Sequence, residues 1–425
     1  MNRAKNDRAA MHRAAMKSAA GDHASSPRLC LIAGTRPEFI KLAPVLHALR
    51  QRPETRNWPV RFIATGQHPD LTGQICRELD IVPDDVLSLP AAPLSATDEG
   101  LGARLAALLS ALAPQVEAHA DIVVVQGDTH SALAGAMAGS YARRPVMHVE
   151  AGLRTGLRHA PFPEELNRCQ IATHATVHFA PTPLAVRNLL TESINPDSIF
   201  CVGNTVIDAI TRFHPRALRP VWPRPHILAT CHRRENWDGG LAALCSALAA
   251  CARLSDTHDI LFLAHPNPAL LSQVRAILGD QPRIYLLPPQ PYRCLLSLLD
   301  GAAAVVTDSG GLQEEASMLG VPVVLCREAT ERPEILSHGG WLAGCDPAAL
   351  LRAIRQALGA PRPPAGRSPF GDGKAADRIV TALVRFWAGQ RPYLKPDELF
   401  DPNRPSDADA PLNNRKAFAI GAGTR

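Results

Sequence analysis

The sequence lacks long apolar runs and paired cysteine motifs. No stretch of about 18 apolar residues occurs, the length a helix needs to cross a bilayer, so we expect no membrane partner. The ten cysteines stand singly without a CxxC pair, which disfavours zinc ribbons and thioredoxin-like chemistry. Several lie in apolar runs, as Cys30, Cys201 and Cys326 do, and this predicts buried, reduced thiols in the cytoplasm.

A strong excess of either charge is also missing. The net charge of +5 over 425 residues gives a weak bias toward anionic ligands and no case for binding nucleic acid. His174 and His178 have a spacing that would suit a metal site on a helix, but His178 falls in a predicted strand, where that geometry fails. We therefore expect neither a metal nor another cofactor.

The two ends of the chain lack the patterns of folded elements. Residues 1–27 are basic and Ala-rich without an apolar core, which disfavours a secretory signal and predicts a disordered basic arm. An organellar transit peptide is the alternative, although no cleavage point is marked. Residues 392–425 are rich in Pro, Asp and Asn and are expected to form a disordered tail.

The rest of the chain has a globular composition, and its length favours two domains. Short apolar runs alternate with amphipathic segments such as Leu101–Leu112, and their continuous apolar character is typical of parallel strands buried on both faces. The expected strands are Leu29–Gly34, Val60–Gly66, Asp121–Gly127, Pro145–Ala151, Val177–Pro181, Ser198–Gly203, Ile227–Cys231, Ile260–His265, Arg283–Leu287, Ala303–Thr307 and Pro322–Cys326. This alternation predicts an α/β fold of two doubly wound, Rossmann-like domains that face each other across a cleft.

A proline-rich break divides the pattern in two. It spans residues 213–226 and is interpreted as a linker, with prolines at Pro215, Pro220, Pro223 and Pro225. The N-terminal domain would then cover residues 28–212 and the C-terminal domain residues 227–372. A final helix over residues 373–391, apolar along one face, is expected to reach back to the first domain.

The residues after the first strand predict an anion site. Ligands of open parallel sheets bind outside the carboxyl ends of the strands. Here Gly34-Thr35-Arg36-Pro37-Glu38 leads into a helix that contains Lys41. The free N–H groups of the helix start attract an anion, and Arg36 and Lys41 add full charges. The alternative is a tight turn with solvated charges.

A second anion site is predicted after the strand Ala303–Thr307. The turn Asp308-Ser309-Gly310-Gly311 opens a helix, Ser309 suits the N-cap, and the glycines Gly310 and Gly311 let a ligand approach the backbone. The helix start can receive a diphosphate, and Glu315, one turn further on, can bind ribose hydroxyls. An ordinary capped helix is the alternative.

Three carboxylates follow strands of the first domain. Asp128 lies in the run Gln126–Thr129, Glu150 follows His148-Val149, and Glu164 lies in the next loop. Each could be structural, but acids grouped beside an anionic ligand repel it, so at least one is expected to have a raised pKa. A raised pKa suits proton transfer.

Basic residues follow the first strand of the second domain. His232 and Arg233 would face the cleft and could neutralise a leaving diphosphate. His265 follows another strand end, where a capping role is an equal alternative.

The chain resembles the non-hydrolysing UDP-N-acetylglucosamine 2-epimerases, which have a GT-B-like fold. The resemblance runs from about Leu29 to Trp387 and is carried by nine motifs in order. They are GTRPEFIKLAPV from Gly34, TGQH from Thr65, QGDT from Gln126, HVEAGLRTG from His148, PFPEELNR from Pro161, VGNTVID from Val202, HRREN from His232, DSGGLQEEA from Asp308 and TERPE from Thr330. Each motif alone is modest, and together they are highly specific.

The resemblance implies roles for individual residues. Catalysis is implied for Asp128, Glu150, Glu164 and His232, and the C-terminal domain would bind UDP. Substrate contact is implied for Arg36, Lys41, Asp128, Glu150, His232, Gln290, Ser309, Glu315 and Arg332. Gln67 and His68 match a site where some bacterial members bind an activating second substrate molecule, although Pro69 and Asp70 depart from that pattern. A homodimer is also implied.

The reaction that the resemblance implies is reversible C2 epimerisation of UDP-N-acetylglucosamine to UDP-N-acetylmannosamine. UDP leaves by anti elimination, and it adds again to a 2-acetamidoglucal intermediate. The C2 proton is scarcely acidic, so cleavage of the C1–O bond must build positive charge beside it. The site therefore needs carboxylates near C2, on both faces of the sugar, and cations on the diphosphate. Which of the three acids plays which part does not follow from the sequence.

Other functions stay open. A hydrolysing epimerase would release free N-acetylmannosamine, but those relatives tend to have GDR and HIEGGE where this chain has Gly127-Asp128-Thr129 and HVEAGLRT. Further alternatives are an epimerase of a modified UDP-sugar, a GT-B glycosyltransferase and a catalytically inactive nucleotide-sugar sensor.

Overall fold

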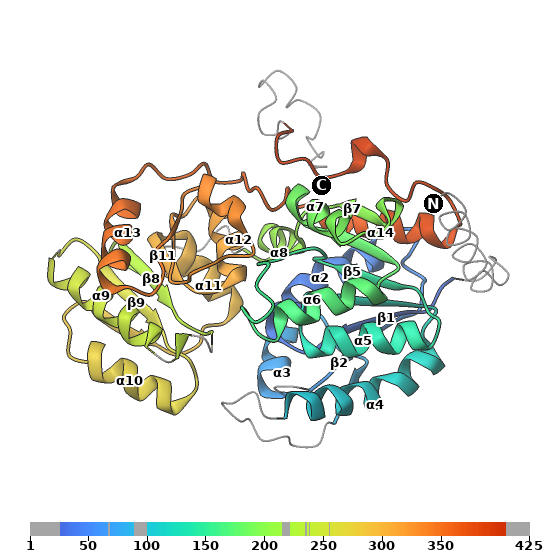
Figure 1. The fold of residues 1–425 in the computed structure, drawn as a ribbon, viewed down its shortest axis with the longest axis horizontal. Helices are drawn as coiled ribbons and strands as arrows, with labels where there is room; N and C mark the ends of the chain where they lie inside the picture. The colour runs from blue at the N-terminus through green and yellow to red at the C-terminus, as the bar shows by residue number, and fades with distance from the viewer. Residues whose placement is uncertain are drawn as a thin grey trace, which may run out of the picture.

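The computed structural model of the protein describes residues 26–66, 69–88, 100–214, 222–233, 236–237, 239–254 and 256–404. Figure 1 shows two α/β lobes side by side, with blue-to-green elements in one and yellow-to-orange elements in the other. Each lobe is built on one parallel sheet with helices on both faces, as the apolar runs predicted. No helix among these residues is long and apolar enough to cross a membrane.

The first sheet has seven strands in the order β3-β2-β1-β4-β5-β6-β7. Its strands are β1 (Leu29–Ala33), β2 (Val60–Ala64), β3 (Asp85–Val86), β4 (Ile122–Gln126), β5 (Val146–Val149), β6 (Val177–Ala180) and β7 (Ile199–Cys201). The helices of this lobe are α2 (Arg36–Gln51), α3 (Pro69–Glu78), α4 (Leu101–His119), α5 (His130–Tyr141), α6 (Glu164–His174), α7 (Pro183–Thr191) and α8 (Thr205–Phe213), with the 3-10 turn η1 (Pro196–Ser198). The central strand β1 pairs with both β2 and β4, so the chain reverses its direction of growth there.

The second sheet has six strands in the order β10-β9-β8-β11-β12-β13 and repeats this arrangement. Its strands are β8 (His226–Thr230), β9 (Asp259–Leu263), β10 (Ile284–Leu287), β11 (Ala302–Thr307), β12 (Val323–Leu325) and β13 (Gly340–Leu342). The helices are α9 (Gly240–Leu254), α10 (Pro268–Leu278), α11 (Tyr292–Asp300), α12 (Gly310–Leu319) and α13 (Pro347–Gly359), with the 3-10 turn η3 (Pro333–Ser337). The reversal lies between β8 and β11, which pair along their length.

The structure confirms every predicted strand, and two further strands were missed. β3 is a two-residue edge strand, and β13 is a three-residue edge strand of Gly-Trp-Leu that is partly exposed. Neither carries the continuous apolar run by which buried strands are found, because an edge strand needs less apolar surface. α8 also extends to Phe213 and β8 begins at His226, so both overlap the ends of the expected linker.

The last helix, α14 (Ala375–Trp387), lies on the first lobe although it follows the second in sequence (Figure 1). It packs against α2 and α8, and its apolar face includes the buried Ile379 and Leu383. Asp208 of α8 holds its N-terminus, since its carboxylate accepts hydrogen bonds from the backbone N–H groups of Ala375 at 3.2 Å and Ala376 at 2.8 Å. The chain therefore passes between the lobes a second time.

The expectation of a disordered tail from residue 392 is wrong for residues 392–404. Tyr393, Leu394 and Phe400 are buried, and the Phe400 backbone N–H donates to the Cys201 carbonyl of the edge strand β7 at 2.8 Å. These three apolar side chains cover the sheet edge and α14, which outweighs the polar composition around them. Of the basic arm expected over residues 1–27, residues 1–25 lie outside the described residues, and so does the tail beyond residue 404.

Candidate active site

The loops that the sequence analysis singled out meet at the two reversal points. The loops after β1 and β4 come from the first sheet, and the loops after β8 and β11 come from the second. In open parallel sheets the crevice at such a point binds ligands, because the neighbouring loops diverge there. The two crevices face each other between the lobes.

A cavity of about 200 Å³ lies at this junction. Its lining residues come from both domains: Arg36, Pro37, Ile40, Lys41 and Val206 from the first, and Thr230, His232, Leu263, Pro289, Gln290, Tyr292, Leu295, Ser309, Gly311, Leu312 and Glu315 from the second. The cavity therefore brings together seven of the predicted site residues, which are Arg36, Lys41, His232, Gln290, Ser309, Gly311 and Glu315.

Glu38 fixes the loop that leads into α2 at the edge of the cavity. Its carboxylate accepts hydrogen bonds from the backbone N–H groups of Gly34 at 3.0 Å and Thr35 at 2.7 Å, and from the Thr129 hydroxyl at 2.8 Å. Burial raises the pKa of Glu38 to about 7, although these hydrogen bonds favour the charged form. Glu38 thus ties the loop after β1 to the loop that carries Asp128. The sequence pattern predicted no separate role for Glu38.

At the start of α12, some residues hold the neighbouring loop in place and others are free to contact a ligand. Asp308 is fully buried and accepts hydrogen bonds from the backbone N–H groups of His232 and Arg233, so it fastens the loop after β8. Ser309 occupies the N-cap position, but its hydroxyl makes no capping hydrogen bond. A side chain at position 311 would meet nothing within 4 Å, so Gly311 leaves room for a ligand to approach the backbone. This geometry suits a phosphate group.

Glu315 and His232 of the second domain line the cavity, and both have shifted pKa values. Burial raises the pKa of Glu315 to about 7, although Tyr292 and Arg36 lower it. His232 is exposed to solvent, yet the cleft walls crowd it, and this desolvation lowers its pKa against the opposing effect of Asp308. A neutral His232 can donate one hydrogen bond to a phosphate oxygen, whereas the full charges come from Arg36 and Lys41.

Glu150 is the most strongly paired of the three predicted acids. Its carboxylate lies 2.5 Å from Lys41 Nζ and 2.9 Å from Arg332 Nη2, and it also accepts hydrogen bonds from Asn204 and Gln126. Burial disfavours its charge, but Lys41 and Arg332 outweigh burial and lower its pKa to about 2. Its backbone is left-handed, with a φ of 67°. Such strain in a non-glycine residue is concentrated at functional sites.

Asp128 and Glu164 form a second acidic group on the same side of the cleft. Arg168 of α6 donates to Asp128 Oδ2 at 2.5 Å, and Asn167 donates to the Asp128 carbonyl at 2.8 Å. Burial raises the pKa of Glu164, and the neighbouring charge of Asp128 raises it further. The expectation that at least one acid would have a raised pKa is therefore met by Glu164, whereas the pKa of Glu150 is lowered.

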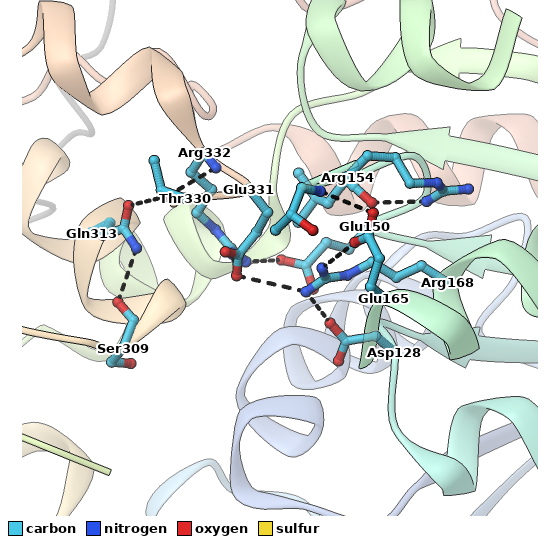
Figure 2. A network of polar contacts seen from close by, with 12 residues as sticks. Asp128, Glu150, Arg154, Glu165, Arg168, Ser309, Gln313, Thr330, Glu331 and Arg332 are labelled. Carbon is cyan, nitrogen blue, oxygen red and sulfur yellow. Dashed lines mark hydrogen bonds and ion pairs between the residues drawn. The ribbon is translucent and has the colours of Figure 1, made fainter. Parts of the chain in front are cut away.

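Three further charged residues, for which the sequence pattern predicted no role, belong to the site: Arg168, Glu314 and Glu331. Each stands inside a quoted motif, and all three ionisable side chains are almost fully buried. Glu314 lies 2.9 Å from Arg332 and 3.7 Å from Lys41. Figure 2 shows Arg168 and Glu331 approaching each other from opposite domains. A charged residue in an otherwise apolar helix or loop was the available signal, because such groups are buried only when paired.

The remaining expectations concern other ligands. Gln67 and His68 lie outside the described residues. In the part of the chain that the structure describes, no group of three or more His, Cys, Asp or Glu side chains could hold a metal ion.

Two parallel α/β domains that enclose a cavity at their strand ends define a protein of the GT-B-like class. Within that class the family model for UDP-N-acetylglucosamine 2-epimerase matches residues 48–384, and the chain belongs to this family. It is 37% identical over 379 residues to the UDP-N-acetylglucosamine 2-epimerase of Salmonella typhimurium, which covers 84% of this chain and 99% of that protein. The Escherichia coli K12 enzyme of the same name is 36% identical over 376 residues, covering 84% and 98%.

Solved structures of UDP-GlcNAc 2-epimerases also match this chain. UDP-GlcNAc 2-epimerase from Neisseria meningitidis, bound to UDP-GlcNAc, matches with a TM-score of 0.76 and 31% identity over 84% of this chain and 99% of that one. The Methanocaldococcus jannaschii UDP-GlcNAc 2-epimerase, in complex with UDP-GlcNAc and UDP, matches with a TM-score of 0.74 and 33% identity over the same shares.

Proposed function

We propose that the protein is a non-hydrolysing UDP-N-acetylglucosamine 2-epimerase that interconverts UDP-N-acetylglucosamine and UDP-N-acetylmannosamine. The observation that carries the proposal is the cavity between the starts of α2 and α12. The three acids do not line this cavity, but Glu150 pairs with Lys41, which does, and the pKa values of Glu150 and Glu164 are shifted in opposite directions. Two relatives with bound UDP-GlcNAc support the substrate assignment. The cavity would hold the UDP group, and the sugar would extend toward the acids of the first domain.

The second domain would bind and stabilise the leaving UDP. The N–H groups at the start of α12, around Gly310 and Gly311, would receive the diphosphate, and Glu315 would bind the ribose. Arg36, Lys41 and Arg332 bring positive charge, and His232 donates a hydrogen bond. These groups stabilise the negative charge that develops as the C1–O bond breaks. Gln290 would contact the substrate from the loop before α11. Its backbone carbonyl accepts a hydrogen bond from Arg36 at 2.8 Å.

The acids would move the protons at C2. Two carboxylates whose surroundings shift their pKa values in opposite directions can act as base and acid in one site. Glu150 is held ionised and would enter as the proton acceptor, whereas Glu164, with its raised pKa, would enter as the proton donor. Asp128 raises the pKa of Glu164 and would contact the substrate. UDP leaves and a 2-acetamidoglucal forms, and re-addition of UDP with a proton from the other face completes the inversion.

Incubation with UDP-N-acetylglucosamine in D2O tests the proposal. We expect UDP-N-acetylmannosamine to form with deuterium at C2. Proton NMR of the sugar and phosphorus NMR of the diphosphate would measure the reaction. E164Q should slow the exchange by about 100-fold or more, the range usual for loss of a general acid or base.

Each alternative predicts a different outcome of the same experiment. Free N-acetylmannosamine with UDP would show a hydrolysing epimerase. Exchange only with a 2,3-diacetamido uronic acid derivative would show an epimerase of a modified sugar. No exchange with either sugar would contradict an epimerase and leave a glycosyltransferase or a nucleotide-sugar sensor.

A further inference from the structure

Glu331 is the centre of a buried arginine cluster at the domain boundary. It lies in the loop between β12 and η3, and its side chain is 1% exposed. Glu331 Oε1 accepts hydrogen bonds from Arg233 at 2.9 Å and from Arg332 at 2.6 Å, and Oε2 accepts from Arg327 at 2.8 Å. The surrounding arginines hold the pKa of Glu331 well below its usual range against the cost of burial. One carboxylate therefore organises three cations of the second domain.

A fourth arginine reaches this cluster from the first domain. Arg168 Nη2 lies 3.6 Å from Glu331 Oε1 and 2.5 Å from Asp128 Oδ2, while Arg168 Nη1 donates to Glu165 at 2.9 Å. The Arg168 side chain is 5% exposed, so its charge is compensated by these carboxylates rather than by water. Arg168 is thus shared between an acid of the predicted active site and Glu331 across the domain boundary.

The contacts continue from Glu331 to the nucleotide end of the cleft. Figure 2 shows a path through Arg332, Thr330 and Gln313 to the turn at Ser309. The Arg332 N–H donates to the Thr330 hydroxyl at 3.1 Å, this hydroxyl donates to Gln313 Oε1 at 2.9 Å, and Gln313 Nε2 donates to the Ser309 carbonyl at 3.2 Å. One polar network therefore joins the proposed diphosphate site to Asp128.

The field around Glu164 depends on the same arginines. The charged groups that act on Glu164 are Asp128, which raises its pKa, and Arg233 and Arg168, which lower it. Both arginines contact Glu331, although they come from different domains. Arg168 and Arg332 have other carboxylate partners, but loss of the Glu331 charge would remove the one carboxylate that lies among all four arginines. Their mutual repulsion would then be less compensated, and they would move apart. Arg168 and Arg233 would then leave their positions beside the acids.

We propose that Glu331 is a positioning residue of the epimerase reaction: it holds Arg168 and Arg233 in place across the domain boundary, and through them it fixes Asp128 and Glu164 for proton transfer. This inference rests on the proposed function, since it assigns those two acids to the chemistry. Glu331 itself contacts no substrate in this role. The domains must meet before Arg168 reaches Glu331, so the acids are aligned only when the cleft is formed.

The test compares E331Q, E331D and R168K with the wild type in the epimerase assay. E331Q should lower kcat by about 100-fold, the effect of misplacing a catalytic group by about 1 Å, while KM stays within about threefold. The high-pH limb of the kcat profile, where Glu164 loses its proton, should move to higher pH because two nearby cations have withdrawn. E331D keeps the charge and should recover part of kcat and return the limb toward its wild-type position. R168K keeps the charge but loses the planar guanidinium group that contacts Asp128, Glu165 and Glu331 together, so it should reproduce the loss in kcat.

The matched control is E328Q, in the same loop. Glu328 is exposed and its carboxylate accepts from the backbone of Cys345 at 3.3 Å, so wild-type kcat and pH profile are expected. A normal pH profile and kcat per folded E331Q molecule, with thermal unfolding alone affected, would overturn the positioning role. So would a raised KM with unchanged kcat. If E331Q fails to fold, a wild-type kcat in R168K overturns the inference. A wild type that forms no UDP-N-acetylmannosamine would instead contradict the proposed function.

Discussion

At the scale of single residues, the pairing of charges decides which acids can do chemistry. Glu150 and Glu164 have the same carboxylate and stand 14 positions apart in the chain. Lys41 and Arg332 surround one, whereas burial and Asp128 act on the other. The lowered pKa of the first and the raised pKa of the second follow from these neighbours alone.

The free energy of unfolding at low pH should depend on the ionisation of Glu150. Because its folded pKa of about 2 is below the usual value of 4.5, its contribution is fully present above pH 4.5 and is lost as pH falls toward 2. We expect E150Q to flatten the pH dependence of the free energy of unfolding over this window. At neutral pH it should cost about 3 kcal/mol, since Lys41 and Arg332 lose a buried partner.

Urea unfolding at a series of pH values measures this effect. The control is E117Q, which removes an exposed carboxylate of α4 and should keep the wild-type slope. An E150Q profile parallel to the wild type between pH 4.5 and 2 would show that Glu150 is not held ionised by its neighbours.

At the scale of elements, helix starts carry most of the site. α2 and α12 both begin where a central strand ends, and each has its start arranged by a buried acid, Glu38 in one case and Asp308 in the other. In both, the acid occupies backbone N–H groups of the adjoining loops. α14 is arranged in the same way by Asp208, although it serves the packing of the domains rather than a ligand.

D208A should therefore destabilise the protein through α14. Loss of a carboxylate cap usually costs about 1–2 kcal/mol, and here two buried N–H groups lose their acceptor. Chemical denaturation would measure the change in the free energy of unfolding. D377A, in the same first turn but exposed, should cost less than about 1 kcal/mol. Equal losses in the two variants would contradict a specific capping role for Asp208.

At the scale of the whole molecule, the chain crosses between the domains twice. The apolar core on one face of the first sheet continues into the second domain without a break. After α14 the chain runs along the edge of the first sheet, where Tyr393 packs between Phe200 and Phe386. Residues 388–404 thus hold the returning helix in place.

F400A tests this last segment. Phe400 is 5% exposed and lies 5.9 Å from the guanidinium of Arg378, so its removal should cost about 3 kcal/mol of stability. UDP affinity, measured by calorimetry, should stay unchanged because none of these residues lines the cavity. P402A, at an exposed neighbouring position, is the control. A wild-type unfolding midpoint for F400A would show that the segment contributes nothing to the fold.

Much of the fold could be predicted because buried parallel strands need continuous apolar runs. The same rule explains the misses: β3 and β13 are edge strands, and the segment around Tyr393 and Leu394 covers a surface that the sequence pattern does not reveal. The candidate site was predicted where motifs follow strand ends, as at Arg36, Asp128 and Ser309. Residues that act through another charged residue, such as Glu331, have no local pattern.

The sequence by itself determined the alternation of strands and helices, the turns that open α2 and α12, and the presence of the three acids. These depend on periodicity, glycine and local hydrogen bonding, which act over a few residues. Only the tertiary structure decided how those acids differ, because a pKa depends on charges within a few ångströms and these come from distant parts of the chain. Lys41 and Arg332 reach Glu150 from opposite domains, and Glu331 meets Arg168 across the same boundary.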